Sequence, residues 1–86
     1  MKIVISPRAE KQLKKASKVN QIAIANKIRK LAKPQRTAEK LQGYSDIERV
    51  RVGDYRIVYK LKKKQIFIVL IGHRREIYKQ LRRLLR

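Results

Sequence analysis

The second half of the chain alternates apolar and polar positions as β-strands do. Runs from Ile47 to Val52 and from Tyr55 to Leu61 flank Gly53-Asp54, a pair typical of a two-residue hairpin turn. A basic turn from Lys62 to Gln65 then leads into the run from Ile66 to Ile71. This run is apolar at every position, as expected for a central strand covered on both faces. We therefore predict three consecutive strands.

The first half has helical spacing after one short strand, Ile3 to Ile5. Ser6 followed by Pro7 predicts a helix N-cap with proline in the first helical position. Asn20 is predicted to cap a second helix, which ends after Ala32 because Pro34 follows. The positions predicted to be apolar contacts are Ala9, Leu13 and Ala16 in the first helix, Ile24, Ile28 and Leu31 in the second, and Val19 with Ile24 as a hydrophobic staple around Asn20.

A third helix is predicted from Arg74 onward, and a connection with weak order signals is predicted at residues 34–43. The apolar side of this last helix consists of Ile77, Tyr78, Leu81, Leu84 and Leu85. The predicted order is β-α-α-β-β-β-α. The expected fold is α+β, with a helical hairpin and a C-terminal helix packed on a largely antiparallel four-stranded sheet, in a single domain over residues 1–86.

Charge adds the strongest functional signal. Twenty-five lysine and arginine residues against six acidic ones leave a formal net charge of +19 on 86 residues. Self-repulsion of this size destabilises a compact chain unless a counter-charge is usually bound. It also exceeds what solubility requires. We therefore expect a polyanion as partner, with nucleic acid the commonest such partner, ahead of an acidic protein or an anionic membrane.

Composition also limits the location of the protein and its chemistry. The chain has no cysteine, which excludes disulfides and thiolate metal sites. The longest apolar run, Ile66 to Ile71, is far shorter than the about 20 residues that a transmembrane helix needs. We expect a cytoplasmic protein without membrane attachment, metal or cofactor.

Strand alternation gathers arginines on one face of the predicted hairpin. With Gly53 and Asp54 in the turn, Arg51 lies opposite Arg56, and the core side holds Val50, Val52, Tyr55, Ile57 and Tyr59. The other side holds Arg49, Arg51, Arg56 and Lys60. Like charges facing each other on a sheet cost up to about 1 kcal/mol, and no acid shares this face. A two-residue turn at Lys63-Lys64 would set Ile71 beside Arg56, so that Arg74 emerges next to the cluster. The pattern indicates an anion site.

Three segments carry a family resemblance. They are Leu41-Gln42-Gly43, the string IERVRVGDYRIVY from Ile47, and GHRREIY from Gly72 to Tyr78. Together they resemble the RelE family of type II toxin–antitoxin systems, within the RelE/ParE superfamily. The similarity extends over essentially the whole chain, including its length and element order.

The resemblance implies a toxin that enters the ribosomal A site and cleaves mRNA without a metal, using the 2′-OH as nucleophile. Carried over by motif, the catalytic residues are Arg49, Arg51, Arg56, Arg74 and Tyr78. Some relatives have lysine where this chain has Arg49 and Arg51, and guanidinium is a poorer proton carrier than ammonium. Arg56 and Arg74 suit a phosphate clamp, whereas Arg49 and Arg51 would orient the backbone. A cognate acidic antitoxin, RelB-like, is implied as partner besides the ribosome and mRNA.

Several assignments stay open. Tyr78 is our candidate base because surrounding cations favour phenolate, although it could stack on a base of the RNA or simply pack in the core. His73 has a suitable intrinsic pKa for acid–base work, and Glu48 is placed by parity on the core side, where we expect an ion pair. Further candidate RNA-binding residues are Lys60, Lys62, Lys63, Lys64, His73, Arg75 and Lys79. The alternatives to an mRNA interferase are a ParE-like inhibitor of DNA gyrase and a non-catalytic basic RNA-binding protein.

Overall fold

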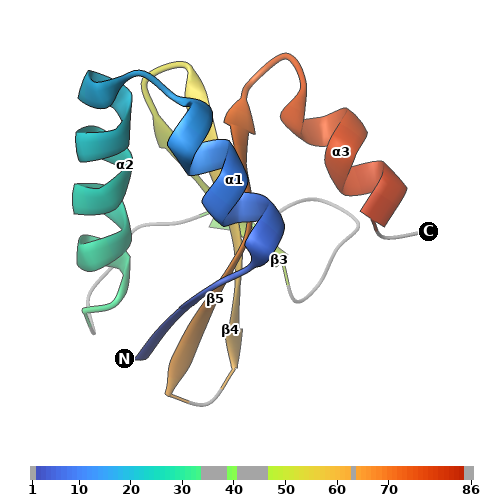
Figure 1. Cartoon of the computed structure of the whole chain (residues 1–86). Helices are drawn as coiled ribbons and strands as arrows, with labels where there is room; N and C mark the ends of the chain where they lie inside the picture. Colours follow the sequence, from blue (N-terminus) through green and yellow to red (C-terminus); the bar gives the residue numbers. More distant parts are fainter. Residues whose placement is uncertain (1, 34–38, 41–46, 63, 85–86) are drawn as a thin grey trace.

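The computed structural model describes residues 2–33, 39–40, 47–62 and 64–84, and the predicted order of elements is confirmed (Figure 1). The elements are β1 (Lys2–Ile5), α1 (Pro7–Lys15), α2 (Lys18–Leu31), β2 (Glu39–Lys40), β3 (Ile47–Val52), β4 (Tyr55–Lys62), β5 (Gln65–His73) and α3 (Ile77–Leu84). None of the helices in these ranges is long and apolar enough to cross a membrane.

The strands form one mixed sheet in the order β1-β5-β4-β3-β2. β1 runs parallel to β5, and the other neighbours are antiparallel, as in the predicted four-stranded arrangement. The additional strand β2 has two residues and pairs with β3. It lies within residues 34–43, which we predicted to be a connection. Pro34, predicted to end the second helix, lies outside the described residues; α2 itself ends at Leu31, with Ala32 as its C-cap.

Of the three predicted helix starts, that of α1 is confirmed and that of α2 is wrong, and α3 begins at Ile77 rather than at Arg74. The Ser6 side chain accepts a hydrogen bond from the Ala9 backbone N–H at 3.0 Å, and Pro7 occupies the first turn. The cap of α2 is Ser17 rather than Asn20, because the Ser17 hydroxyl accepts from the Asn20 backbone N–H at 3.3 Å. Val19 is 78% exposed, so the predicted hydrophobic staple does not form.

Replacing the actual cap gives a direct check of this helix start. Ser17→Ala is expected to lower the free energy of unfolding by about 1 kcal/mol, because it leaves the Asn20 N–H without its acceptor. Asn20→Ala, inside the helix, should change stability by less than about 0.5 kcal/mol. Urea denaturation of both variants measures the difference, and equal destabilisation by the two would contradict the assignment.

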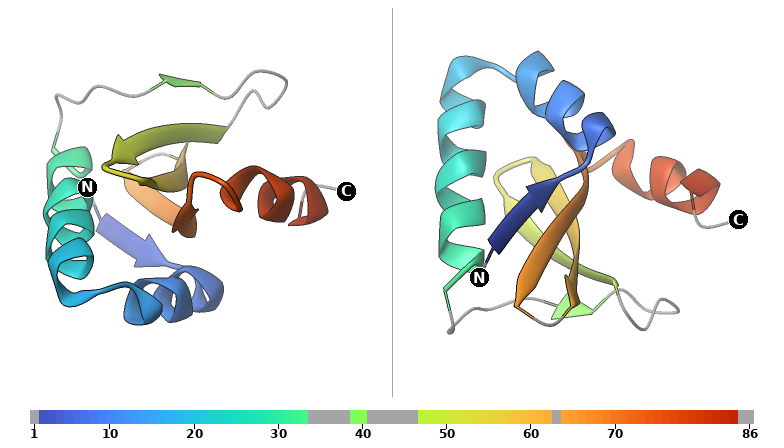
Figure 2. Two further views of the ribbon diagram at one scale, coloured as in Figure 1. Left: turned by 90° about the horizontal axis from the view of Figure 1, so that it is seen from above. Right: turned by 60° about the horizontal axis from the view of Figure 1, so that its bottom comes forward.

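The sheet is covered on both faces, so the molecule has two apolar clusters (Figure 2). The main core lies between the sheet and the α1–α2 hairpin, and the second core lies between the sheet and α3. The buried residues of the main core are Ala9, Ile24, Ile28, Leu31, Val50, Ile57, Tyr59, Ile66, Ile68 and Ile71. Those of the second core are Ile47, Val58, Leu70, Ile77 and Leu81. The apolar face predicted for the β3–β4 hairpin is therefore confirmed.

Candidate nucleic-acid interface

Three arginines share the face of the β3–β4 hairpin that is opposite the main core. Arg51 pairs with Arg56 across the strands, and Arg49 pairs with Val58, which faces the second core. Gly53 adopts a positive φ of 58° in the connecting turn, a conformation that glycine reaches without the strain of a Cβ. The predicted register is confirmed, and with it the direct juxtaposition of two guanidinium-bearing residues.

The register between β4 and β5 agrees with the prediction from Lys62 to Tyr59 and differs from it beyond Tyr59. A β-bulge lies between the pairs Val58–Leu70 and Tyr59–Ile68, so that β5 carries one extra residue, Val69. As a result Gly72, and not Ile71, lies opposite Arg56. A bulge shifts the alternation by one position, which lets Leu70 enter the second core and Ile71 the main core. The chain leaves the sheet after His73, immediately before Arg74.

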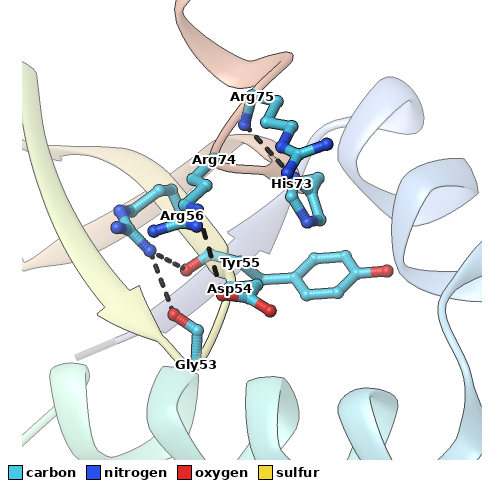
Figure 3. A network of polar contacts seen from close by, with 7 residues as sticks. All are labelled: Gly53, Asp54, Tyr55, Arg56, His73, Arg74 and Arg75. Carbon is cyan, nitrogen blue, oxygen red and sulfur yellow. Dashed lines mark hydrogen bonds and ion pairs between the residues drawn. The ribbon is translucent and has the colours of Figure 1, made fainter.

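The fourth arginine is tied to the turn between β3 and β4. The backbone N–H of Arg74 donates to the carbonyl oxygen of Asp54 at 2.8 Å, and Arg74 Nε lies 3.9 Å from Asp54 Oδ1. Arg56 donates from Nη1 to the carbonyl oxygens of Gly53, at 3.1 Å, and of Tyr55, at 3.0 Å. Figure 3 shows Arg56 and Arg74 together beside this turn. Asp54, which we expected to serve only the turn, is thus an ion-pair partner at the site.

The pKa of Arg56 reflects the positive charges around it. Desolvation lowers the pKa of Arg56 below its usual value, and the charges of Arg51, Arg49 and Arg74 lower it further. The Asp54 carboxylate acts in the opposite direction. The other three arginines therefore lie close enough to Arg56 for their charges to disfavour its protonated form.

Tyr78 approaches the cluster from α3. Its hydroxyl oxygen accepts a hydrogen bond from Nη1 of Arg49, and the guanidinium carbon of Arg49 lies 5.5 Å from the centre of the Tyr78 ring. The half-buried ring also packs against the second core. The Tyr78 side chain is thus anchored by its ring and presents its oxygen to a cation.

His73 is not brought to the arginine cluster. Its Nδ1 accepts from the backbone N–H of Arg75 at 3.2 Å, and its ring meets Tyr55 edge-on, with 6.1 Å between centroids. Both rings point away from the guanidinium groups of Arg56 and Arg74 (Figure 3). Cross-strand partners share a face, so pairing with Tyr55 assigns His73 to the side of the main core.

The other candidate RNA-binding residues are not all near the arginines, since Lys62 and Lys64 lie at the opposite end of β4 from Arg56. Lys60 is exposed and lies opposite Ile47, on the face that carries the arginines. Lys62, Lys64, Arg75 and Lys79 are exposed as well, whereas Lys63 lies outside the described residues. Glu48 faces the main-core side, as parity predicts, and its carboxylate accepts a hydrogen bond from the Tyr59 hydroxyl at 3.1 Å.

In the described part of the chain, no three His, Cys, Asp or Glu residues gather as metal ligands would. Four guanidinium groups and a phenol in contact with one of them can bind a phosphodiester and hold it beside a potential proton acceptor.

Comparison with known proteins identifies the family. The family model for the ParE toxin of type II toxin–antitoxin systems, parDE, matches residues 3–78. The chain therefore belongs to this family, within the RelE/ParE superfamily that its motifs indicate, and is a toxin of a type II toxin–antitoxin system. A search of curated protein sequences finds no match.

Solved structures confirm the fold. The isolated RelE toxin of E. coli is 23% identical with a TM-score of 0.74, and the match covers 99% of this chain and 98% of that one. The RelB–RelE complex of Methanococcus jannaschii gives 23% identity, a TM-score of 0.74 and coverage of 90% and 96%. YafQ of E. coli gives 20% identity, a TM-score of 0.66 and coverage of 88% and 96%. The chain thus has the fold of RelE toxins.

Proposed function

We propose that this toxin is an endoribonuclease that cleaves mRNA in the ribosomal A site. The observation that carries the proposal is that Arg49, Arg51 and Arg56 share one face of the β3–β4 hairpin, with Arg74 beside its turn and Tyr78 in contact with Arg49. A surface that only attracts RNA needs charge spread along it. This surface has guanidinium groups gathered beside one turn, with a phenol in contact with one of them, which suits a reaction at one phosphate.

In the proposed mechanism, Tyr78 acts as a phenolate, which the hydrogen bond from Arg49 stabilises, and its oxygen accepts the proton of the ribose 2′-OH. The 2′-oxygen attacks the phosphorus, the bond to the 5′-oxygen breaks, and a 2′,3′-cyclic phosphate forms. Arg56 and Arg74 bind the non-bridging oxygens, where negative charge develops. Arg51 hydrogen-bonds the leaving 5′-oxygen, which takes its proton from solvent.

Purified protein added to ribosomes programmed with a defined message tests this proposal. We expect cuts within the codon in the A site, with a cyclic or 3′-phosphate on the upstream fragment and no cleavage of the same RNA free in solution. Intact message under conditions that bind the toxin to ribosomes would reject the nuclease.

A second function has support from the family model, whose description is that of a ParE toxin. A ParE-like toxin would inhibit DNA gyrase by protein contact and would leave mRNA intact. The arginines and Tyr78 would then serve only as surface and core residues. Induced expression separates the two functions, because a gyrase inhibitor produces DNA damage without ribosome-associated cuts.

We further propose an acidic antitoxin as the physiological partner, because solved complexes of RelE with RelB join a toxin of this fold to an antitoxin. A segment with carboxylates that folds over Arg56 and Arg74 would neutralise the crowded cations. We expect it to contact or displace α3. A toxin–antitoxin complex that leaves residues 74–84 untouched would refute this docking place.

Bound phosphate should stabilise the free toxin through the same cluster. At about ten times its Kd, phosphate adds about 1.4 kcal/mol to the free energy of unfolding, which raises the melting temperature by about 6–11 °C for a domain of this size. Differential scanning calorimetry in phosphate and in chloride of equal ionic strength measures the effect. Arg56→Ala should remove most of the increase, and an increase of equal size in that variant would exclude the cluster as the binding site.

A further inference from the structure

A single side chain joins α1, β5 and α3. The side-chain Nε2 of Gln12 on α1 donates to Oε1 of Gln80 on α3 at 2.6 Å. The Oε1 of the same Gln12 accepts from the backbone N–H of Ile71 at 2.8 Å. Both hydrogen bonds are partly buried, and the two glutamines are 68 positions apart in the sequence. They link helices that cover opposite faces of the sheet (Figure 2).

The reason for this bridge lies in the unequal lengths of β1 and β5. The parallel pairing ends at Ile5 and Ile68, but β5 continues to His73. The Ser6 N–H donates to the Ile68 carbonyl at 3.0 Å and the Ser6 hydroxyl donates to the Val69 carbonyl at 2.8 Å. The side-chain oxygen of Gln12 then accepts a hydrogen bond from the N–H of Ile71, as a backbone carbonyl would if β1 continued. An amide is suited to this place because it accepts with one end and donates with the other.

The two flanks of α3 are held differently from its centre. Ile77 and Leu81 form the buried stripe, and at about 100° per residue Tyr78 and Gln80 lie about 80° to either side of it. Apolar burial is non-directional, so a stripe alone leaves the helix free to roll. The Gln80–Gln12 bond holds one flank, and the contact of Tyr78 with Arg49 holds the other.

Because β5 packs closely against the start of α3, a rotation of α3 about its axis would change specific contacts. A Cβ added to Gly72 would lie 3.1 Å from Cδ1 of Ile77 and 3.6 Å from Oε1 of Gln80. The backbone of β5 therefore touches α3 at the position opposite Arg56. A rotation of α3 would change these contacts and carry the Tyr78 oxygen away from Arg49.

We infer that the hydrogen bond between Gln12 and Gln80 sets the rotation of α3 and so positions Tyr78 against Arg49. Gln12 and Gln80 are positioning residues, and Gln12 is 59 positions from Ile71 and 68 from Gln80 in the sequence. The catalytic consequence rests on the proposed function, whereas the structural consequence for Tyr78 does not.

A matched pair of substitutions at position 80 tests the inference. Gln80→Met keeps the length and helical preference of the side chain but removes the acceptor, whereas Gln80→Glu still accepts from Gln12 Nε2. With fluorotyrosine incorporated, the Tyr78 signal in fluorine NMR is assigned from Tyr78→Phe. We expect this signal to move in Gln80→Met and to stay near its original position in Gln80→Glu.

On programmed ribosomes, Gln80→Met should cleave about 10- to 100-fold more slowly with unchanged RNA affinity, and Gln80→Glu should stay close to the unsubstituted toxin. If Gln80→Met melts much earlier, Gln80→Ala repeats the comparison. A Tyr78 signal that is unmoved in the Met and Ala variants overturns the inference. A moved signal in a toxin that cleaves no RNA supports the positioning and rejects the nuclease.

Discussion

Arg74→Ala is expected to reduce mRNA cleavage by about 100- to 1,000-fold and to abolish growth arrest, because it removes one half of the proposed clamp on the phosphate. The fold should persist. The Arg74 side chain is 54% exposed, its ion pair with Asp54 spans 3.9 Å, and such surface pairs contribute at most about 1 kcal/mol. The backbone bond from Arg74 to Asp54 does not depend on the side chain.

Two further variants complete this test. Arg74→Lys keeps the charge but loses the planar fork, so it should recover only part of the activity. Arg29→Ala removes an exposed arginine from α2, on the other side of the sheet, where it donates to Asn26 at 2.8 Å, and should leave toxicity unchanged. Circular dichroism confirms folding in each case. A folded Arg74→Ala protein that still arrests growth would remove Arg74 from the mechanism.

Ile57→Ala is expected to give the largest loss of stability, about 2–5 kcal/mol in the free energy of unfolding. Ile57 is 0% exposed at the centre of the main core, on a strand with neighbours on both sides. Its loss leaves a cavity that the surrounding strands cannot close. Domains of this kind are stable by only about 5–15 kcal/mol, so the variant should be partly unfolded at moderate temperature.

Urea denaturation of Ile57→Ala beside Val19→Ala provides the measurement. Val19 is 78% exposed, so its truncation should change stability by no more than about 0.5 kcal/mol. Equal losses of unfolding free energy in the two variants would contradict the burial of Ile57 in the main core.

The arginine face was predictable from the sequence because its determinants are local. Gly53 and Asp54 fix a two-residue turn, and once the turn is fixed, alternation decides which side each residue of β3 and β4 takes. Arg49, Arg51 and Arg56 follow without any knowledge of the rest of the chain. The cap of α2 was harder because Ser17 and Asn20 are both good N-caps. The helix starts at the earlier one, which adds a turn of backbone hydrogen bonds and leaves Val19 exposed.

The features that could not be predicted depend on contacts between distant segments. The β-bulge at Val69 lets Leu70 pack in the second core and Ile71 in the main core, on opposite sides of the sheet. Residues 66–71 of β5 are all apolar, so the sequence gives no local sign of the bulge. The bridge from Gln12 to Gln80 requires knowing that β1 stops short of the end of β5. Strand alternation could not predict the face on which His73 lies, because His73 comes after the bulge. It also could not predict the ion pair between Asp54 and Arg74.

We propose that four guanidinium groups bind one phosphodiester. Titration with a short RNA whose 2′-hydroxyl is methylated, followed through the arginine Nε–Hε NMR signals, tests it without the complication of cleavage. We expect the signals of Arg49, Arg51, Arg56 and Arg74 to shift together with a common Kd, while those of Arg8 on α1 and Arg29 on α2 stay in place. Shifts concentrated on α1 and α2, or four different dissociation constants within the cluster, would contradict it.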